Sequence, residues 1–308
     1  MSRPTTLDLP AHASARRLET SRGSFAALDA PSAPEAPAAR GTALLVPGFT
    51  GSKEDFLDLL APLSAAGFRV VAVDGRGQYE SGGPRDEAAY AQDQLAADVT
   101  AQGAALAAAT DGGPLHVLGH SLGGHIVRAA LLADGPGPWS SVTLMSSGPA
   151  AITAAQQVRT QLLIDHLPTM DMETAWWAMR SLDAESSGAP AGNVVEVPAD
   201  AGTAWLDDFL HRRWVATVPE QLIATARQLM TERDRVAELA AIPLPKLVLS
   251  GEVDYAWPVP LLDTMAERLG ARRVVVKGAE HSPNAERPVE TAAALTAFWT
   301  GESDATDN

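Results

Sequence analysis

The chain has 308 residues, a formal net charge of −15 and no cysteine. With 46% apolar and 20% charged residues, it has the composition of a globular protein with a sizeable core. Its length predicts one domain with an insertion. The acidic charge argues against nucleic acid and anionic membrane surfaces as partners, because both recruit Lys and Arg. The lack of cysteine excludes disulfides, thiolate zinc sites and a cysteine nucleophile.

The N-terminal segment, residues 1–20, carries charged residues such as Arg3, Arg16 and Arg17 and has no continuous apolar run. It therefore lacks the pattern of a secretory signal. No later stretch reaches the roughly 18 apolar residues of a membrane span. We therefore expect a cytoplasmic protein without stable membrane association, which agrees with the absence of cysteine.

Short runs rich in Val and Leu alternate with longer segments of helical periodicity. The runs predict strands buried on both faces, at 43–46, 69–73, 115–118, 142–145, 246–249 and 273–276. The helical segments are 54–66, 90–109, 122–133, 259–269 and 288–299. This alternation predicts an α/β fold with a mostly parallel, doubly wound sheet.

Two segments depart from this alternation. Near the N-terminus, 16–20 and 24–29 flank a Ser-Arg-Gly turn, which predicts an antiparallel hairpin at the sheet edge. From about residue 150 to 241 the pattern is mainly helical, which predicts an inserted cap. The expected organisation is a first core part at 1–149, the cap at 150–241, a second core part at 242–301 and a disordered tail at 302–308.

The predicted cap holds four of the seven tryptophans, Trp176, Trp177, Trp205 and Trp214. They are candidates to line an apolar substrate pocket beneath the cap. The alternative is that they pack the cap onto the core. The sequence leaves both interpretations open.

The pentapeptide Gly119-His120-Ser121-Leu122-Gly123 matches G-x-S-x-G and stands between a predicted strand and a predicted helix. That context is the one a nucleophile elbow requires. The glycines leave room for a sharp strand-to-helix turn, and the start of the helix favours negative charge near Ser121. Ser121 is therefore the candidate nucleophile.

A serine nucleophile needs a general base and an acid that orients the base. His281 lies between the last predicted strand and the final helix, so it is the candidate base. Asp254 follows the strand at 246–249, at the carboxyl edge where such folds build their sites, and Glu252 is the fallback acid. His116, His120 and His125 fall on strand, elbow and helix, so they are expected to be buried and not to form a metal site.

The oxyanion formed during acyl transfer needs two backbone N–H donors. Leu122, directly after the nucleophile, supplies the first. Pro47-Gly48-Phe49 follows the strand at 43–46, and a close turn at Gly48 directs the Phe49 N–H toward the substrate. An ordinary glycine-rich loop is the alternative interpretation.

With these motifs in order, the chain resembles the α/β-hydrolase superfamily on both sides of the predicted cap. Similar members include carboxylesterases, monoacylglycerol lipases, lactonases, thioesterases, C–C bond hydrolases and cofactor-free haloperoxidases. The resemblance implies a Ser, Asp, His triad, no cofactor, and serine chemistry that acts most often on an acyl ester.

Two motifs depart from the family pattern. Pro47-Gly48 stands where the family commonly has His-Gly, which affects loop detail and not the backbone donor. The segment from Asp74 to Ser81 resembles the family's D-x-R-G-x-G-x-S turn, with Tyr79 in place of the second glycine. A reshaped turn would make Tyr79 available to the pocket.

The expected function is therefore hydrolysis of a carboxylic ester, thioester or lactone with a small to medium apolar acyl group. The partner is a small-molecule acyl substrate, and no metal or cofactor is expected. The same triad also supports C–C bond cleavage or peroxide chemistry, since pocket shape decides between them. A third alternative is a ligand-binding protein that has kept the hydrolase fold. The sequence leaves the natural substrate and the oligomeric state open.

Overall fold

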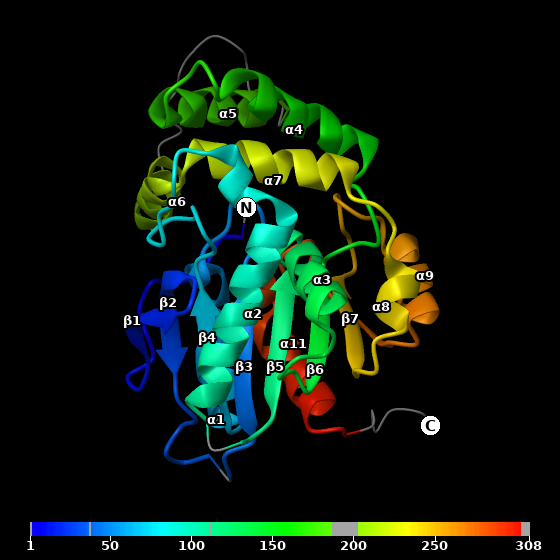
Figure 1. Ribbon diagram of the computed structural model, residues 1–308. Coiled ribbons are helices and arrows are strands. Elements are labelled where there is room, and N and C mark those ends of the chain that lie inside the picture. Colours follow the sequence, from blue (N-terminus) through cyan, green and yellow to red (C-terminus); the bar gives the residue numbers. More distant parts are fainter. Residues whose placement is uncertain (1, 37, 111, 187–202, 303–308) are drawn as a thin grey trace.

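A computed structural model describes residues 2–36, 38–110, 112–186 and 203–302 (Figure 1). This part of the chain contains an eight-stranded sheet of order β1-β2-β4-β3-β5-β6-β7-β8. β1 pairs antiparallel with β2, and β2 with β4, whereas the other neighbours are parallel. The predicted fold class, including the N-terminal hairpin, is confirmed. The strands are β1 (Ser14–Thr20), β2 (Gly23–Ala30), β3 (Gly41–Val46), β4 (Phe68–Val73), β5 (Leu115–His120), β6 (Ser141–Met145), β7 (Lys246–Gly251) and β8 (Arg272–Val276).

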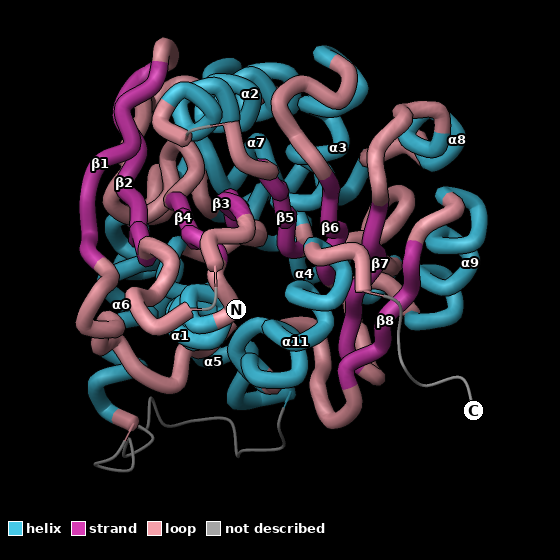
Figure 2. The backbone as a smooth tube through the Cα atoms, turned by 90° about the horizontal axis from the view of Figure 1, so that it is seen from below, coloured by secondary structure: helices cyan, strands magenta, loops and turns pink. Residues whose placement is uncertain are grey.

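Helices cover both faces of the sheet. α2 and α3 lie on one face, and α1 and α11 lie on the other (Figure 2). Residues of α8 and α9 belong to the same hydrophobic cluster as those of α2 and α3. The helices of the core are α1 (Leu57–Ala65), α2 (Gln92–Ala108), α3 (Leu122–Asp134), α8 (Val236–Ala240), α9 (Val259–Leu269), α10 (Pro283–Glu286) and α11 (Pro288–Trp299), with 3-10 turns η1 (Lys53–Phe56) and η2 (Glu87–Tyr90).

Side chains of the central strands alternate between two apolar cores. In β3, Leu44 and Val46 join the cluster beneath α2 and α3, whereas Ala43 and Leu45 join the cluster beneath α1 and α11. Successive residues of a strand point to opposite faces, so a strand covered on both faces must be apolar throughout. This requirement is why continuous Val and Leu runs identified these strands in the sequence.

The prediction of burial on both faces is wrong for β8. Four of its five residues are partly or fully exposed, and Val275 retains 39% of its accessible surface. β8 is the last strand of the sheet and pairs only with β7. An edge strand is covered less completely than a central one, so its apolar run does not imply complete burial.

Of the five described helices between β6 and β7, four lie above the carboxyl ends of the strands (Figure 1). They are α4 (Ala154–His166), α5 (Met172–Ser186), α6 (Ala204–Ala216) and α7 (Pro219–Thr231). We call α4–α7 the cap helices. The predicted range of the cap, 150–241, also includes α8, whose Val236 and Leu239 belong to the core cluster, and the bounds of the cap stay a prediction. Residues 187–202 lie outside the described part of the chain. The tail that the sequence analysis predicts as disordered also lies outside it, except Glu302.

The cap helices have a hydrophobic cluster of their own, which includes Trp176, Phe209 and Trp214. Trp176 and Trp214 are buried, Trp205 packs against the cluster, and Trp177 is 47% exposed. None of the four contributes to the wall of the cavity described below. Among the described residues, Trp176, Trp205 and Trp214 therefore pack within the cap cluster and do not line this cavity, whereas Trp177 is partly exposed to solvent.

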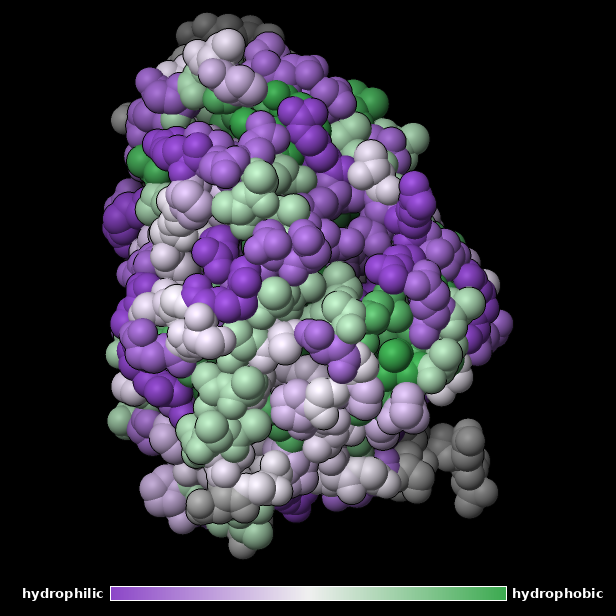
Figure 3. Space-filling view, viewed as in Figure 1, coloured by the Kyte–Doolittle hydropathy of each residue, from purple (hydrophilic) through white to green (hydrophobic). Residues whose placement is uncertain are grey.

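Hydrophilic residues are spread over the cap helices and the core on the face shown in Figure 3, and hydrophobic ones form small groups between them. Within the described residues, no helix combines the length and the apolar character that crossing a bilayer requires.

Candidate active site

Ser121 lies in the sharp turn between β5 and α3. Its backbone takes φ 53° and ψ −119°, a conformation that L-residues rarely adopt. Its N–H donates to the Met145 carbonyl at 2.9 Å, which ties the turn to the end of β6. A Cβ atom at Gly119 would collide with the Gly123 backbone, and one at Gly123 would collide with the Val46 carbonyl. The two glycines of the motif are therefore required by close backbone packing.

A chain of hydrogen bonds joins Ser121, His281 and Asp254. His281 Nε2 lies 3.1 Å from Ser121 Oγ, and His281 Nδ1 lies 2.9 Å from Asp254 Oδ2. All three residues are at least nine-tenths buried. The three candidates, separated by up to 160 residues in the sequence, thus meet at the carboxyl edge of the sheet in the predicted arrangement.

Asp254, and not Glu252, reaches the imidazole. The second oxygen of Asp254, Oδ1, accepts the backbone N–H groups of Ala256 and Trp257 at 2.8 and 3.0 Å. Glu252 is exposed, and its carboxylate accepts the Gly278 N–H at 2.6 Å instead. The fallback acid therefore contacts the backbone of the loop that carries His281 and not its ring.

Two aromatic neighbours and one buried histidine hold the loop of His281. The Tyr255 ring lies 4.7 Å from the His281 ring, centroid to centroid, and Trp257 lies 6.2 Å away. His120 Nε2 donates to the His281 carbonyl at 2.9 Å. Burial lowers the pKa of His120 to about 3, so this ring is a neutral donor at physiological pH.

His116 and His125 are buried as well, as expected from the sequence. Among the described residues, no group of three or more His, Asp or Glu side chains is arranged to hold a metal ion. His116 stacks on Trp299 and His125 contacts Trp257, so both are part of the packed core.

Gly48 and Phe49 form the loop between β3 and η1 beside Ser121. A Cβ atom at Gly48 would lie 3.2 Å from the Ser121 Cβ, so the loop backbone passes close to the serine. Leu122 is the first residue of α3, where N–H groups have no acceptor within the helix. The two candidate oxyanion donors therefore belong to backbone segments on either side of Ser121.

Tyr79 takes φ 35°, the left-handed region in which glycine is favoured. This backbone conformation explains why the α/β-hydrolase turn commonly has glycine at that position. The Tyr79 ring packs edge-on against Phe209 of α6 at 6.0 Å and lies 4.7 Å from Lys53 Nζ. It is absent from the described cavity wall, so Tyr79 contributes to the contact between cap and core.

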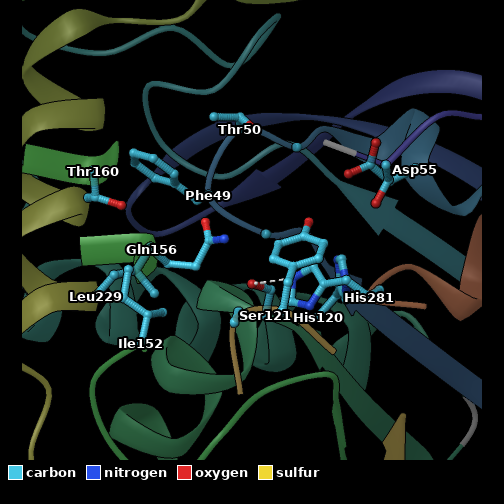
Figure 4. Close-up of a pocket in the computed structure, with 15 residues that line it drawn as sticks. Phe49, Thr50, Asp55, His120, Ser121, Ile152, Gln156, Thr160, Leu229 and His281 are labelled. Atoms are coloured by element: carbon cyan, nitrogen blue, oxygen red, sulfur yellow. Dashed lines mark hydrogen bonds between the residues drawn. The ribbon is translucent and has the colours of Figure 1, made fainter. Parts of the chain in front are cut away.

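A cavity of about 160 Å³ opens above Ser121 (Figure 4). In the view of Figure 4, Phe49, Ile152, Leu229 and Thr160 lie on one side of Ser121, and Asp55 and His281 lie on the other. The lining residues are Ser2, Gly48, Phe49, Thr50, Gly51, Asp55, His120, Ser121, Ile152, Gln156, Thr160, Leu229, Tyr255, Ala256 and His281.

Sequence reasoning missed several of these residues. Ser2 and Asp55 reach the cavity from the N-terminal segment and η1, and Gln156 and Thr160 reach it from successive turns of α4. Gln156 and Thr160 are four residues apart, which places them on one face of the helix. No sequence motif marks that face, because the cavity forms only when α4 lies over the elbow.

The Asp55 carboxylate forms a buried ion pair with an arginine of the cap helices. Its Oδ1 lies 2.6 Å from Nη1 of Arg213, which belongs to α6, and both side chains are almost fully buried. Burial raises the pKa of Asp55, and the Arg213 guanidinium opposes that shift. The pair joins cap and core at the edge of the cavity.

Comparison with known proteins agrees with this architecture. Residues 43–294 match the model of the alpha/beta hydrolase family. A proline iminopeptidase from Levilactobacillus brevis is 27% identical over 279 residues, which cover 86% of this chain and 90% of that protein.

Solved structures are also similar. A carboxylesterase from Nitrososphaera gargenis aligns with a TM-score of 0.68 at 20% identity, covering 94% of this chain and 100% of that one. A membrane phospholipase A, a bacterial virulence factor, aligns with a TM-score of 0.69 at 27% identity, covering 96% and 88%. The family match spans most of the chain and includes Ser121, Asp254 and His281. The chain therefore belongs to the alpha/beta hydrolase family and is a hydrolase enzyme.

Proposed function

We propose that this hydrolase cleaves carboxylic esters, or related thioesters and lactones, of small to medium acyl groups through Ser121, His281 and Asp254. The observation that carries the proposal is the hydrogen-bond chain from Ser121 Oγ through the His281 imidazole to Asp254. The burial of these groups supports it, since a desolvated site strengthens such interactions.

The reaction begins when His281 Nε2 accepts the Ser121 proton as Oγ attacks the acyl carbonyl. Asp254 stabilises the imidazolium, and the Phe49 and Leu122 N–H groups stabilise the oxyanion. The imidazolium then gives its proton to the leaving alcohol, and the acyl group remains on Ser121. Water, deprotonated by His281, attacks the acyl-enzyme and releases the carboxylic acid and free Ser121.

The cavity supports an ester substrate over a peptide with a free N-terminus. A substrate ammonium group needs a carboxylate partner, and the carboxylate in the described cavity wall, that of Asp55, is already paired with Arg213 at 2.6 Å. Apolar contacts from Phe49, Ile152 and Leu229 suit an acyl group instead.

The test is hydrolysis of p-nitrophenyl esters of increasing acyl length, with proline p-nitroanilide as the peptidase substrate. We expect ester turnover, its loss in Ser121→Ala, and covalent labelling of the wild type by a fluorophosphonate. Ser147→Ala is the matched control, because Ser147 is a buried serine after the neighbouring strand β6 whose Oγ has no hydrogen-bond partner among the described residues.

The Ser147→Ala enzyme should keep both turnover and labelling. A wild-type enzyme that neither hydrolyses an ester nor reacts with the probe would reject the proposal. Faster cleavage of proline p-nitroanilide than of every ester would replace it with an iminopeptidase activity.

A further inference from the structure

Gln78 connects two loops beside the active site and does not line the cavity. It is 5% exposed and lies in the turn after β4. Its Nε2 donates to the Gly48 carbonyl at 2.7 Å, with a longer contact to the Phe49 carbonyl at 3.4 Å. Its Oε1 accepts the Gly75 N–H at 2.9 Å. One amide group thus links the turn after β4 to the loop after β3.

The bond to Gly48 fixes the orientation of one peptide unit. The Gly48 carbonyl and the Phe49 N–H belong to the same peptide, and the described chain contains no cis peptide bond. In a planar trans peptide the C=O and N–H bonds point in opposite directions. When Gln78 holds the carbonyl, the Phe49 N–H must therefore point away from Gln78.

A second, longer hydrogen bond also acts on this peptide, because the Gly51 N–H donates to the Gly48 carbonyl at 3.2 Å. Glycine at position 48 leaves the backbone with few steric limits, and a Cβ there would lie 3.2 Å from the Ser121 Cβ, so one of the two would have to shift. The bond from Gln78 is shorter, at 2.7 Å, and stabilisation of an oxyanion depends on donors that are firmly oriented before the reaction. Gln78 thus adds an external restraint to a loop whose own hydrogen bond to this carbonyl is longer.

The restraint is itself held in place. Both ends of the Gln78 amide are bonded, which fixes the side chain in one orientation, and the bond to Gly48 is buried. A buried, bifunctional hydrogen bond loses little to competition with water. The neighbouring Asp74 carboxylate accepts the Lys53 N–H at 2.7 Å, so the far end of the same loop is tied to the same turn.

We propose that Gln78 is a positioning residue that directs the Phe49 N–H toward the oxyanion. The inference rests on the proposed function, because it assigns to Gln78 the orientation of a donor in that mechanism. Gln78 makes no contact with the reacting atoms and acts through the Gly48–Phe49 peptide.

The test replaces Gln78 with methionine, which keeps the length of the side chain and removes both amide hydrogen bonds. We expect kcat to fall by about tenfold to a thousandfold, the upper limit being the loss of an entire oxyanion donor, and KM to change less than about threefold. The matched control is Gln228→Glu, which removes another amide bond to a backbone carbonyl, that of Tyr90 at 2.6 Å. Its kcat should stay within about twofold of the wild type.

A tetrahedral adduct separates positioning from general structural support. When Ser121 Oγ bonds to the carbonyl carbon of an aryl trifluoromethyl ketone, the C=O π electrons move to oxygen as an oxyanion and the serine proton moves to His281. The affinity of Gln78→Met for this ketone should fall by the same factor as kcat/KM. Its affinity for the matching trifluoromethyl carbinol, which forms no oxyanion, should stay unchanged.

If the methionine variant does not fold, Gln78→Glu provides the second measurement. Its ionised carboxylate cannot donate to the Gly48 carbonyl, so the ratio of its kcat to that of the wild type should be low at high pH. The ratio should rise at lower pH, where protonation restores the donor. Ketone affinity and kcat near wild-type values across pH would overturn the positioning role while Ser121→Ala still identifies the hydrolase. A wild-type enzyme with no ester turnover would overturn both proposals.

Discussion

The Asp254 carboxylate divides its two oxygens between His281 and the backbone. Oδ2 lies 2.9 Å from His281 Nδ1, while Oδ1 accepts the N–H groups of Ala256 and Trp257. The backbone donors fix the plane of the carboxylate, so the oxygen that faces the imidazole cannot rotate away. The imidazole is thereby held with Nδ1 as the donor and Nε2 free to accept the Ser121 proton.

We predict that Asp254→Asn lowers kcat by about 10⁴ with little effect on KM, the loss known for a serine protease in which this carboxylate is changed to an amide. The amide can hold the imidazole in the wrong tautomer and no longer stabilises the imidazolium. Steady-state kinetics with a p-nitrophenyl ester checks the effect.

Glu252→Gln is the control for that variant, because Glu252 is the alternative acid and its carboxylate accepts the Gly278 N–H instead of contacting the imidazole. Its kcat should remain within about threefold of the wild type. A larger loss in Glu252→Gln than in Asp254→Asn would reverse the assignment of the acid.

The sequence identified the strands and the three reacting residues because local pattern and chain order determine them. Leu44 and Leu45 face opposite cores, so burial on both faces appears directly as an apolar run. Ser121, Asp254 and His281 each follow a strand at its carboxyl end, and parallel strands bring those ends to one edge.

Contacts between distant loops left no comparable signal. The family-like turn drew attention to Tyr79, yet Gln78 beside it makes the contact with Gly48, 30 residues away. Ser2 reaches Ser282 across 280 residues at 2.9 Å. Likewise, the alternative roles of Trp214 could not be separated until the helices around it were placed, because an apolar side chain fits a pocket and a core equally well.

The buried pair between cap and core leads to a stability prediction. We expect Arg213→Met to lower the free energy of unfolding by about 3 to 5 kcal/mol, because it leaves the buried Asp55 without its partner. Urea denaturation monitored by tryptophan fluorescence measures the loss.

Arg180→Met is the comparison, since Arg180 pairs with Asp207 at 3.5 Å with both side chains about a third exposed. It should cost no more than about 1 kcal/mol. Equal losses of unfolding free energy in the two variants would mean that the buried Arg213 pair contributes no more to stability than the partly exposed Arg180 pair.

Buried His116 leads to a prediction about pH. Burial lowers the pKa of His116 from 6.5 to about 4, and the ring stacks on Trp299 at 5.2 Å. Because the folded pKa is depressed, the unfolded chain binds the proton first, and stability due to neutral His116 is complete above pH 6.5 and lost toward pH 4. Within that window the contribution changes by about 1.4 kcal/mol per pH unit.

The difference between wild type and His116→Gln isolates this contribution, because the other titrating groups are common to both proteins. In urea unfolding at several pH values, the free energy of unfolding of the wild type should fall more steeply than that of the variant as the pH falls below 6.5. The difference between the two slopes should correspond to the uptake of about one proton on unfolding. Parallel stability curves would show that His116 is protonated in the folded protein as readily as in the unfolded one.

The size of the cavity leads to a prediction about acyl length. A cavity of about 160 Å³ is close to the roughly 150 Å³ that accommodates benzene in an engineered protein core. We therefore expect kcat/KM for p-nitrophenyl acetate or butyrate to exceed that for the octanoate by at least about tenfold, since each misfitting methylene is costly.

Leu229 is the side chain to shorten, because it lines the cavity from α7. Leu229→Ala removes three carbon atoms from the wall, so the preferred acyl chain should lengthen by about two to three carbons. Leu222→Ala is the matched control: Leu222 lies on the same helix, is fully buried in the cap cluster and does not line the cavity. Both variants should lose about 2 to 5 kcal/mol of stability, but only Leu229→Ala should shift the acyl preference. The same shift in both variants would mean that loosening of the cap, and not the shape of the wall beside Leu229, sets the length of the acyl group.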